Sequence, residues 1–270
     1  MVKLVLNPIY HIDILRYKLY NKNMSNSRLT FLEPTNFTLP ITIFNTLVDD
    51  AFYFGYVKNN QANLSGLLNH LIPNLTQHRK ELHGSFLNAN DGDEILTNKI
   101  EENIFKIYFN KYDYCDDGVA VVPFRVNKEH MQDFLDIVDN LLYNLNIDFT
   151  GFVRSLLVEY ASRRLNQREY FFYYKEISRI KEAILQGIIC HFYTKEEKDT
   201  FVPISIELSR IDEQNLIIGY NPESEMAYVL PLSNVKRIVL TDVAYDISDD
   251  DSDFVYEHYA EYQKTQEEDV

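Results

Sequence analysis

The segment Phe37–Ile41 (FTLPI) returns 85 positions later as Val122–Val126 (VPFRV), and this duplication decides the fold. Apolar and polar residues alternate in both copies, which is typical of a β-strand. A longer segment repeats at the same offset, because Asn63–Ile72 (NLSGLLNHLI) corresponds to Asp148–Leu157 (DFTGFVRSLL). Each decapeptide predicts the start of a helix. The order strand, helix, turn, helix therefore occurs twice.

An amphipathic helix is expected between the strand and the decapeptide of each copy. Its apolar residues correspond at an offset of 87, as Phe44, Leu47, Val48 and Ala51 in the first copy and Met131, Phe134, Leu135 and Val138 in the second. One such unit is too small to bury its own strand and helices, so we expect the two to share a core and to pair their strands antiparallel. Pro73 and the polar residues after it predict the end of the first unit.

Changes in composition divide the chain into four segments. We expect a strand and helix in residues 1–27, the duplicated domain in 28–168, a second domain in 169–245 and an acidic tail in 246–270. The second domain begins with a helix over 176–186 and continues with about five short strands, which predicts a small β-barrel. The expected fold class is α+β.

Charge is distributed unevenly along the chain, whose formal net charge is −15. From Asp246 to Val270 there are ten carboxylates and one lysine, which predicts a mobile or loosely docked tail. The sign reverses between Arg154 and Lys181, where seven basic residues stand against three glutamates. An acidic protein with one basic stretch is a candidate for nucleic-acid binding, although basic residues on a solvated helix are also ordinary.

Catalysis and membrane insertion find no support in the sequence. The seven histidines show no metal-ligand spacing, and no glycine-rich phosphate loop or nucleophile motif occurs. We therefore expect a protein that is not an enzyme and that uses no cofactor or metal. There is no run of about 18 apolar residues, and two widely separated cysteines, Cys115 and Cys190, suit a reducing cytoplasm.

The duplicated unit resembles the ribbon-helix-helix fold, in which two strand-helix-helix units pair their strands and intertwine their helices. The resemblance is carried by the alternating strands and by a glycine near the start of each second helix, Gly66 or Gly151. It implies a pseudo-dimer built within one chain.

The segment Ile177–Leu240 resembles the WYL domain, a small Sm-like β-barrel found in bacterial regulators. The matching residues are Ala183-Ile184, Tyr193, Pro203, Leu216–Tyr220 and Tyr228–Ile238, while Asn215-Leu216-Ile217 stands where the family has Trp-Tyr-Leu. A ribbon-helix-helix module joined to a WYL domain looks like the accessory proteins encoded beside compact type VI-D CRISPR effectors. Those proteins bind RNA and raise the activity of the RNA-guided nuclease, so the resemblance implies single-stranded RNA and a CRISPR effector as partners.

Three groups of residues are candidates for binding. On the paired strands, Arg125 suits guanine and Asn127 suits adenine in a DNA groove. The basic stretch offers guanidinium groups beside rings, as single-stranded RNA requires, although most of the aromatic run 170–174 is expected in the core. Its candidates are Arg154, Arg163, Arg164, Arg168, Tyr173 and Tyr174. On the WYL-like frame, the residues expected to line a ligand face are His191, Tyr193, Arg210, Lys236 and Arg237.

The leading hypothesis is a non-enzymatic, cytoplasmic nucleic-acid-binding accessory or regulatory protein that prefers single-stranded RNA and modulates a CRISPR RNA-guided nuclease. A DNA-binding transcription regulator with a ligand-sensing barrel is one alternative. A protein-interaction module whose acidic tail docks on a basic partner is another. We also expect a homodimer, because short exposed strand edges need covering.

Overall fold

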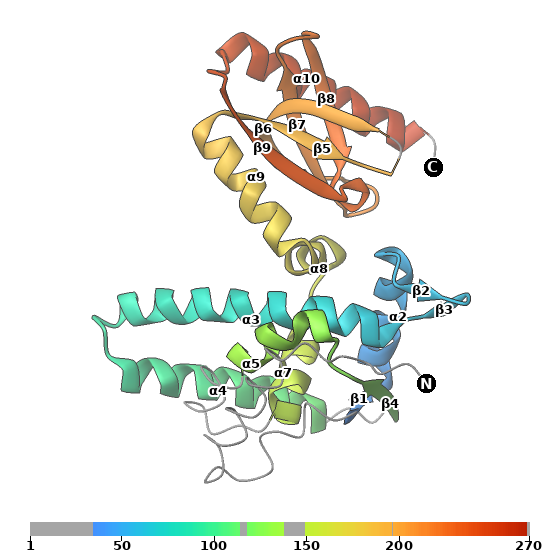
Figure 1. Ribbon diagram of the computed structural model, residues 1–270, viewed down its shortest axis with the longest axis vertical. Helices are drawn as coiled ribbons and strands as arrows, with labels where there is room; N and C mark the ends of the chain where they lie inside the picture. The colour runs from blue at the N-terminus through green and yellow to red at the C-terminus, as the bar shows by residue number, and fades with distance from the viewer. Residues whose placement is uncertain (1–34, 114–117, 138–148, 196, 269–270) are drawn as a thin grey trace, which may run out of the picture.

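The computed structural model describes residues 35–113, 118–137, 149–195 and 197–268. A helical half and a sheet half are joined through the short helix α8, Leu165–Phe172 (Figure 1). The strand and helix expected in residues 1–27 lie outside the described residues, as does Cys115.

The predicted pairing of the duplicated strands is confirmed. Strand β1, Thr35–Pro40, pairs antiparallel with β4, Val119–Phe124, within the same chain. Phe37 lies opposite Val122 in this two-stranded ribbon. Side chains alternate along β4, so that Val122 and Phe124 are buried while their neighbours are more exposed. This alternation is what the period of two in the sequence requires.

Helices follow each strand of the ribbon. In the first unit they are α2, Ile41–Tyr53, and α3, Leu64–Ala89, with a small hairpin of β2, Val57–Lys58, and β3, Gln61–Ala62, between them. In the second unit the described helices are η3, Lys128–His130, α5, Met131–Ile137, and α7, Phe149–Ala161. Leu67 of α3 and Phe152 of α7, which correspond in the repeat, are both fully buried. The two units thus share one core.

The expected break at Pro73 is wrong. Helix α3 runs for 26 residues through Pro73 and then turns back into α4, Glu94–Asp113. A proline inside a helix removes one backbone donor and disfavours the preceding turn. Here Leu71, Ile72 and Leu75, which flank the proline, are buried in the core, and this burial outweighs the local preference.

The sheet half contains five antiparallel strands in the order β8-β7-β6-β5-β9. Their bounds are β5 Ile188–Tyr193, β6 Lys198–Leu208, β7 Asn215–Asn221, β8 Met226–Pro231 and β9 Arg237–Ala244, with a 3-10 turn, η5, at Leu232–Asn234. The prediction of a closed barrel is wrong. Strands β8 and β9 form the two edges of this sheet and do not pair in the described chain. A helix packs against β7 and β8.

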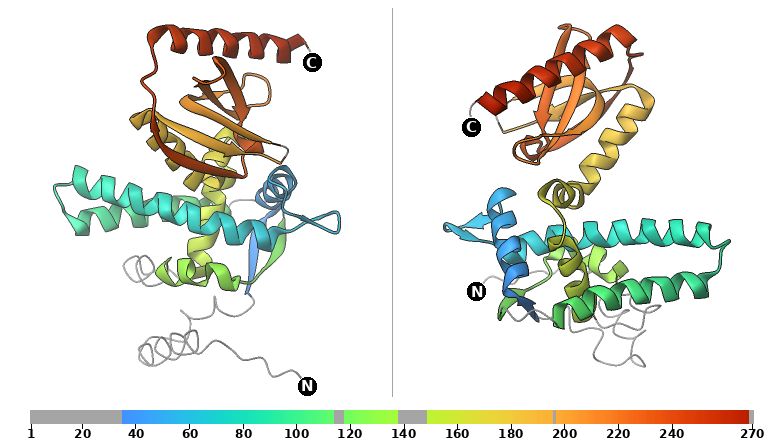
Figure 2. Two further views of the ribbon diagram at one scale, coloured as in Figure 1. Left: turned by 45° about the horizontal axis from the view of Figure 1, so that its top comes forward. Right: turned by 180° about the vertical axis from the view of Figure 1, so that it is seen from behind.

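That helix is α10, Asp249–Glu268, which occupies the segment expected to be a mobile tail. It lies along β7 and β8, at the end of the molecule away from α3 and α4 (Figure 2). Val255 is fully buried in a cluster with Ile218, Tyr220 and Ala227 of the sheet. The tail prediction is therefore wrong, because one side of this acidic helix, which carries Val255 and Tyr259, packs against the sheet, while Phe254 and Tyr256 stay exposed.

Helix α9, Tyr174–Gln186, contacts β5, β6 and β9. It ends at Gly187, whose φ of +61° lies in the left-handed region that glycine adopts at low cost. A Cβ at this position would lie 2.8 Å from the carbonyl oxygen of Tyr245, so a larger residue is also blocked by contact. Buried Ile177, Ile180 and Ala183 of α9 belong to the same hydrophobic core as the helical half.

Candidate nucleic-acid interface

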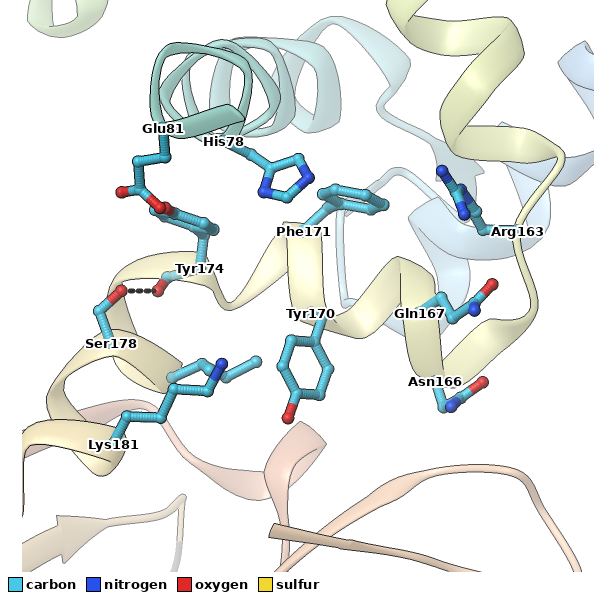
Figure 3. A pocket seen from close by; sticks show the side chains of 11 residues that line it. His78, Glu81, Arg163, Asn166, Gln167, Tyr170, Phe171, Tyr174, Ser178 and Lys181 are labelled. Atoms are coloured by element: carbon cyan, nitrogen blue, oxygen red, sulfur yellow. Dashed lines mark hydrogen bonds between the residues drawn. The ribbon is translucent and has the colours of Figure 1, made fainter. Parts of the chain in front are cut away.

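A groove runs between α3 on one side and α8 and α9 on the other. It consists of two adjoining pockets of about 520 and 490 Å³, which share Glu81, Tyr174 and Ser178. We call this continuous depression the α3–α9 groove. Figure 3 shows the larger pocket, with side chains from all three helices directed around it.

Side chains of α3 hold the end of α8 in place. The backbone carbonyl of Phe172, the last residue of α8, accepts hydrogen bonds from Nε2 of His70 and Nδ2 of Asn74, both at 2.8 Å. The carbonyls of the last helical turn have no partner within the helix, so these bonds replace missing ones. The Phe172 ring also stacks on Phe54, the residue that follows α2, with centroids 3.8 Å apart. The wall of the groove is thus fixed against α3 at its base.

Two buried carboxylates anchor the rest of α8. Asp50 of α2 accepts hydrogen bonds from Nε and Nη2 of Arg168, at 2.8 and 2.9 Å, and from the Tyr160 hydroxyl at 2.7 Å. Glu169 accepts one from the Tyr53 hydroxyl at 2.8 Å and two from Asn215 of β7, at 2.7 and 2.8 Å. Consecutive residues of α8 therefore tie it to both halves of the molecule.

The burial of Glu169 has an electrostatic consequence. Desolvation raises the pKa of this carboxyl group, while the hydrogen bonds from Asn215 and Tyr53 favour the charged form and oppose the shift. Every described partner of this carboxylate is a donor, so the site suits an ionised acceptor.

The groove collects positive charge from an acidic protein. Its two pockets are lined by five lysine and arginine residues but by only two carboxylates, Glu81 and Asp133. The cationic residues are Lys80, Arg163, Lys175, Arg179 and Lys181. Like charges gathered on a concave surface reinforce one another's field and attract an anion.

Aromatic rings lie among these charges. The Nζ atom of Lys181 sits 5.1 Å from the centre of the Tyr170 ring, a cation–π contact. The His78 ring meets the Phe171 ring edge to face, with centroids 5.0 Å apart. Burial lowers the pKa of His78, so this imidazole is neutral at pH 7 and acts as a polar ring. Rings and cations in one groove can stack bases and hold phosphates.

Two of the residues predicted from the basic stretch line the groove. They are Arg163, which also forms an ion pair with Glu159 at 3.3 Å, and Tyr174. Arg164 is exposed at the start of α8 but does not line either pocket, and Arg154 is half-buried in α7.

The other two predicted residues of this stretch, Arg168 and Tyr173, form contacts within the protein. The Arg168 guanidinium is bound to Asp50 and also donates to the backbone carbonyl of Arg163 at 2.8 Å. Tyr173 is buried, and its hydroxyl donates to the backbone carbonyl of Ser233 at 3.3 Å. Neither faces the α3–α9 groove. The expectation that most of the aromatic run is core is confirmed, because Phe171, Phe172 and Tyr173 are all buried.

The ribbon places Arg125 and Asn127 just beyond the end of β4. Both side chains are exposed, but the backbone at these two positions binds the side chain of Asn69 on α3. The exposed residues of the strands themselves include Asn36, Val119, Val121 and Pro123, which carry no charge.

The residues predicted on the WYL-like frame separate into two places. Tyr193 of β5 lies opposite Arg237 of β9, whose guanidinium is 5.8 Å from the centre of the tyrosine ring. Lys236 adjoins this pair and His191 lies two residues along β5, bonded to Thr200 at 3.0 Å. Arg210 follows the opposite end of the 11-residue strand β6 and binds Gln263 of α10 through its backbone.

Sequence reasoning missed the residues that α3 contributes to the groove. His78 and Lys80 lie beyond Pro73, where the sequence indicates an end to regular structure, and only the unbroken helix brings them opposite α9. Asn166 and Gln167 were also missed, since no pattern of charge marks them. Lys175, Arg179 and Lys181 belong to the basic stretch, which was the available signal for them.

Among residues 35–113, 118–137, 149–195 and 197–268, no group of three or more His, Cys, Asp or Glu side chains is arranged to hold a metal ion. Within the same residues, no helix has the length and hydropathy needed to cross a membrane.

The architecture defines a mixed α+β chain with a helical half and a five-stranded antiparallel sheet. A similar fold occurs in a solved structure described as "Crystal structure of a CRISPR Cas-related protein", with a TM-score of 0.56 and 14% sequence identity over 83% of this chain. This chain spans 66% of the length of that structure, just under two thirds. No family model matches the sequence, and no curated protein matches it.

Proposed function

We propose that this chain is a non-enzymatic accessory protein that binds single-stranded RNA along the α3–α9 groove and modulates a CRISPR RNA-guided nuclease. The observation that carries the proposal is the convergence of five cationic side chains with the rings of Tyr170, Phe171 and Tyr174 in one groove. The fold similarity to a CRISPR Cas-related protein supports the choice of the nuclease as partner.

Single-stranded RNA is favoured over duplex DNA because of where the charge lies. Unpaired bases can stack on rings while their phosphates meet cations, whereas the bases of a duplex are stacked on one another. In ribbon-helix-helix proteins the paired strands read DNA. The corresponding strands of this chain, Thr35–Pro40 and Val119–Phe124, carry no charged residue. A basic surface suited to a duplex backbone is therefore lacking on these two strands.

The test is a comparison of single-stranded RNA, single-stranded DNA and duplex DNA of equal length, each titrated across a salt series. The proposal expects the tightest binding for single-stranded RNA, with log Kd rising linearly with log salt. Addition of the protein to a CRISPR RNA-guided nuclease should then change its cleavage rate. Equal, salt-independent binding to all three probes, or none to any, would overturn the proposal.

A pair of exposed lysines outside the groove offers a control for non-specific charge effects in this assay. Lys58 and Lys99 are exposed on β2 and α4, outside the groove. Their joint replacement by glutamate changes the net charge as much as any double reversal inside the groove. RNA affinity that fell equally in this variant and in a double lysine-to-glutamate variant of the groove would indicate attraction to the whole protein. That result would contradict binding in the groove.

A further inference from the structure

The two pockets of the α3–α9 groove differ in chemistry. The smaller one contains Lys80, Lys175 and Arg179, with Tyr174 as its only ring. The larger one contains the rings of His78, Tyr170, Phe171 and Tyr174. One pocket is therefore suited to phosphates and the other to flat apolar groups with polar edges.

The larger pocket also presents two side-chain amides. In Figure 3, Tyr170 and Phe171 lie on different sides of the pocket, with Gln167 and Asn166 on the wall below Arg163 and with Lys181 across from them. Its volume of about 520 Å³ falls in the range of roughly 300–1,000 Å³ that is usual for small-molecule sites. A pocket with rings, amides and cations has the groups needed to bind a nucleotide.

Asn166, at the wall of the larger pocket, has a hydrogen-bond acceptor that is unpaired within the described part of the chain. Its Oδ1 atom is buried and has no hydrogen-bond donor among the described residues. Buried polar atoms are almost always hydrogen-bonded, so an acceptor left alone beside a pocket requires a donor. Its backbone is held in place, because the carbonyl of Asn166 accepts a bond from Nδ2 of Asn215 at 2.7 Å. Pairing with a ligand in the pocket requires the carboxamide to rotate about its terminal bond, a torsion with broad minima.

We propose that the larger pocket receives one unpaired adenine base, which stacks on the rings while its edge pairs with the Asn166 carboxamide. The amide oxygen accepts from the adenine amino group and the amide nitrogen donates to a ring nitrogen, a pairing that asparagine makes with adenine. A purine also offers a larger face to Tyr170 than a pyrimidine does. Neighbouring phosphates lie on the cations of the smaller pocket.

This inference rests on the proposed function and adds a base preference to it. The probes are oligomers of adenosine, cytidine and uridine of equal length, an oligomer with the same sugar-phosphate backbone but no bases, and adenosine monophosphate. We expect the adenosine oligomer to bind at least tenfold more tightly than the oligomer without bases and more tightly than the other two. Weak binding of adenosine monophosphate that competes with the adenosine oligomer would show the base site without the contribution of the RNA backbone.

Two variants separate base recognition from backbone attraction. Asn166→Leu should remove the preference for adenosine while the dependence of log Kd on log salt keeps its slope. Lys175→Glu should weaken all oligomers by a similar factor and reduce that slope by about 1. A circular dichroism spectrum and an unchanged melting temperature establish that each variant is folded.

The outcomes are distinguishable. If no RNA probe binds the wild-type protein, the proposed function fails. If RNA binds with a steep salt dependence but adenosine, uridine and base-free oligomers bind equally, only the adenine site is overturned. The same holds if Asn166→Leu retains the full preference for adenosine.

Discussion

The α3–α9 groove and the outer face of α10 are both rich in charge, but one is concave and the other convex. In the groove, cations from α3 and α9 face one another across two pockets that also contain rings. On α10, exposed carboxylates such as Asp250, Asp253 and Glu257 are spread along the free side of a single helix. Charges that converge can bind one ligand together, whereas charges on a convex face are solvated separately.

The comparison also shows that charge-rich segments can contain core residues. The basic stretch buries Glu169 and holds Arg168 in an ion pair, and the acidic tail buries Val255 and Gln263. In both segments the charge of the sequence therefore does not tell which residues of the helix are buried. The predictions below separate the buried side from the exposed side in each region.

The largest effect is expected at Arg168, a basic residue that does not face the groove. Arg168→Glu places a second carboxylate against buried Asp50 and removes two hydrogen bonds of 2.8 and 2.9 Å. Breaking a buried pair in this way costs about 3–5 kcal/mol of unfolding free energy. Urea denaturation measures the loss, and Arg164→Glu, at an exposed residue four positions earlier, serves as the control. Equal midpoints for the two variants would show that the Asp50 pair contributes nothing.

A smaller loss is expected when α10 is removed by truncation after Ser248. The deletion exposes the cluster around Ile218 and removes the hydrogen bond from the Tyr259 hydroxyl to the carbonyl of Leu208, at 2.9 Å. Loss of one buried valine and its neighbours costs about 3 kcal/mol, which lowers the melting temperature by roughly 6–12 °C. A thermal melt measures it.

The matched control for the truncation removes charge but keeps the helix. Glu257→Gln with Glu261→Gln alters only exposed residues of α10 and should change the melting temperature by no more than about 1–2 °C. A truncated protein that melts with the wild type would mean that the helix is not part of the folded core.

The smallest expected effect on stability is pH-dependent and arises at His70, beside the base of the groove. Burial lowers the pKa of His70 below its ordinary value of 6.5, and its Nε2–H donates to the carbonyl of Phe172. As pH falls through about 6.5, the unfolded chain binds a proton that the folded chain does not, so stability decreases until the lowered pKa is passed. Above pH 7 this loss is absent.

Urea midpoints between pH 5 and pH 8 measure the slope. His70→Gln, which can still donate to the carbonyl of Phe172, should reduce the acid-side decrease in stability. His258→Gln on the exposed side of α10 is the control and should keep the wild-type slope. An identical pH profile for all three proteins would contradict the assignment to His70.

The sequence alone predicts the duplicated ribbon well and the groove only in part. The intrachain pairing of β1 with β4 follows from a period of two at a constant offset, which local pattern reveals. The continuation of α3 through Pro73 depends on tertiary burial of Leu71 and Leu75, so local propensity misplaces that boundary. The packing of α10 was likewise missed, because its acidic composition hides the few residues, such as Val255, that pack against the sheet.

The site also divides into residues that local sequence predicts and residues that only the tertiary structure brings in. Arg163 and Tyr174 were predicted because they lie in a contiguous basic and aromatic stretch. Lys80 is about 100 positions away in sequence, and its place opposite α9 is set by the bonds from His70 and Asn74 to α8. Arg168 has the same charge as Arg163, and only the position of Asp50 distinguishes their roles. Convergence in space cannot be read from charge order along the chain.

The most direct test of the account is the RNA affinity of Lys175→Glu with Lys181→Glu, compared with Lys58→Glu with Lys99→Glu. Both variants reverse two exposed lysines, but only the first pair lies in the α3–α9 groove. Fluorescence anisotropy with a labelled single-stranded RNA at low salt should show at least tenfold weaker binding for the groove variant and a salt slope smaller by about 2. The control should bind within about twofold of wild type. Equal affinities for the two variants would contradict the groove as the site of RNA binding.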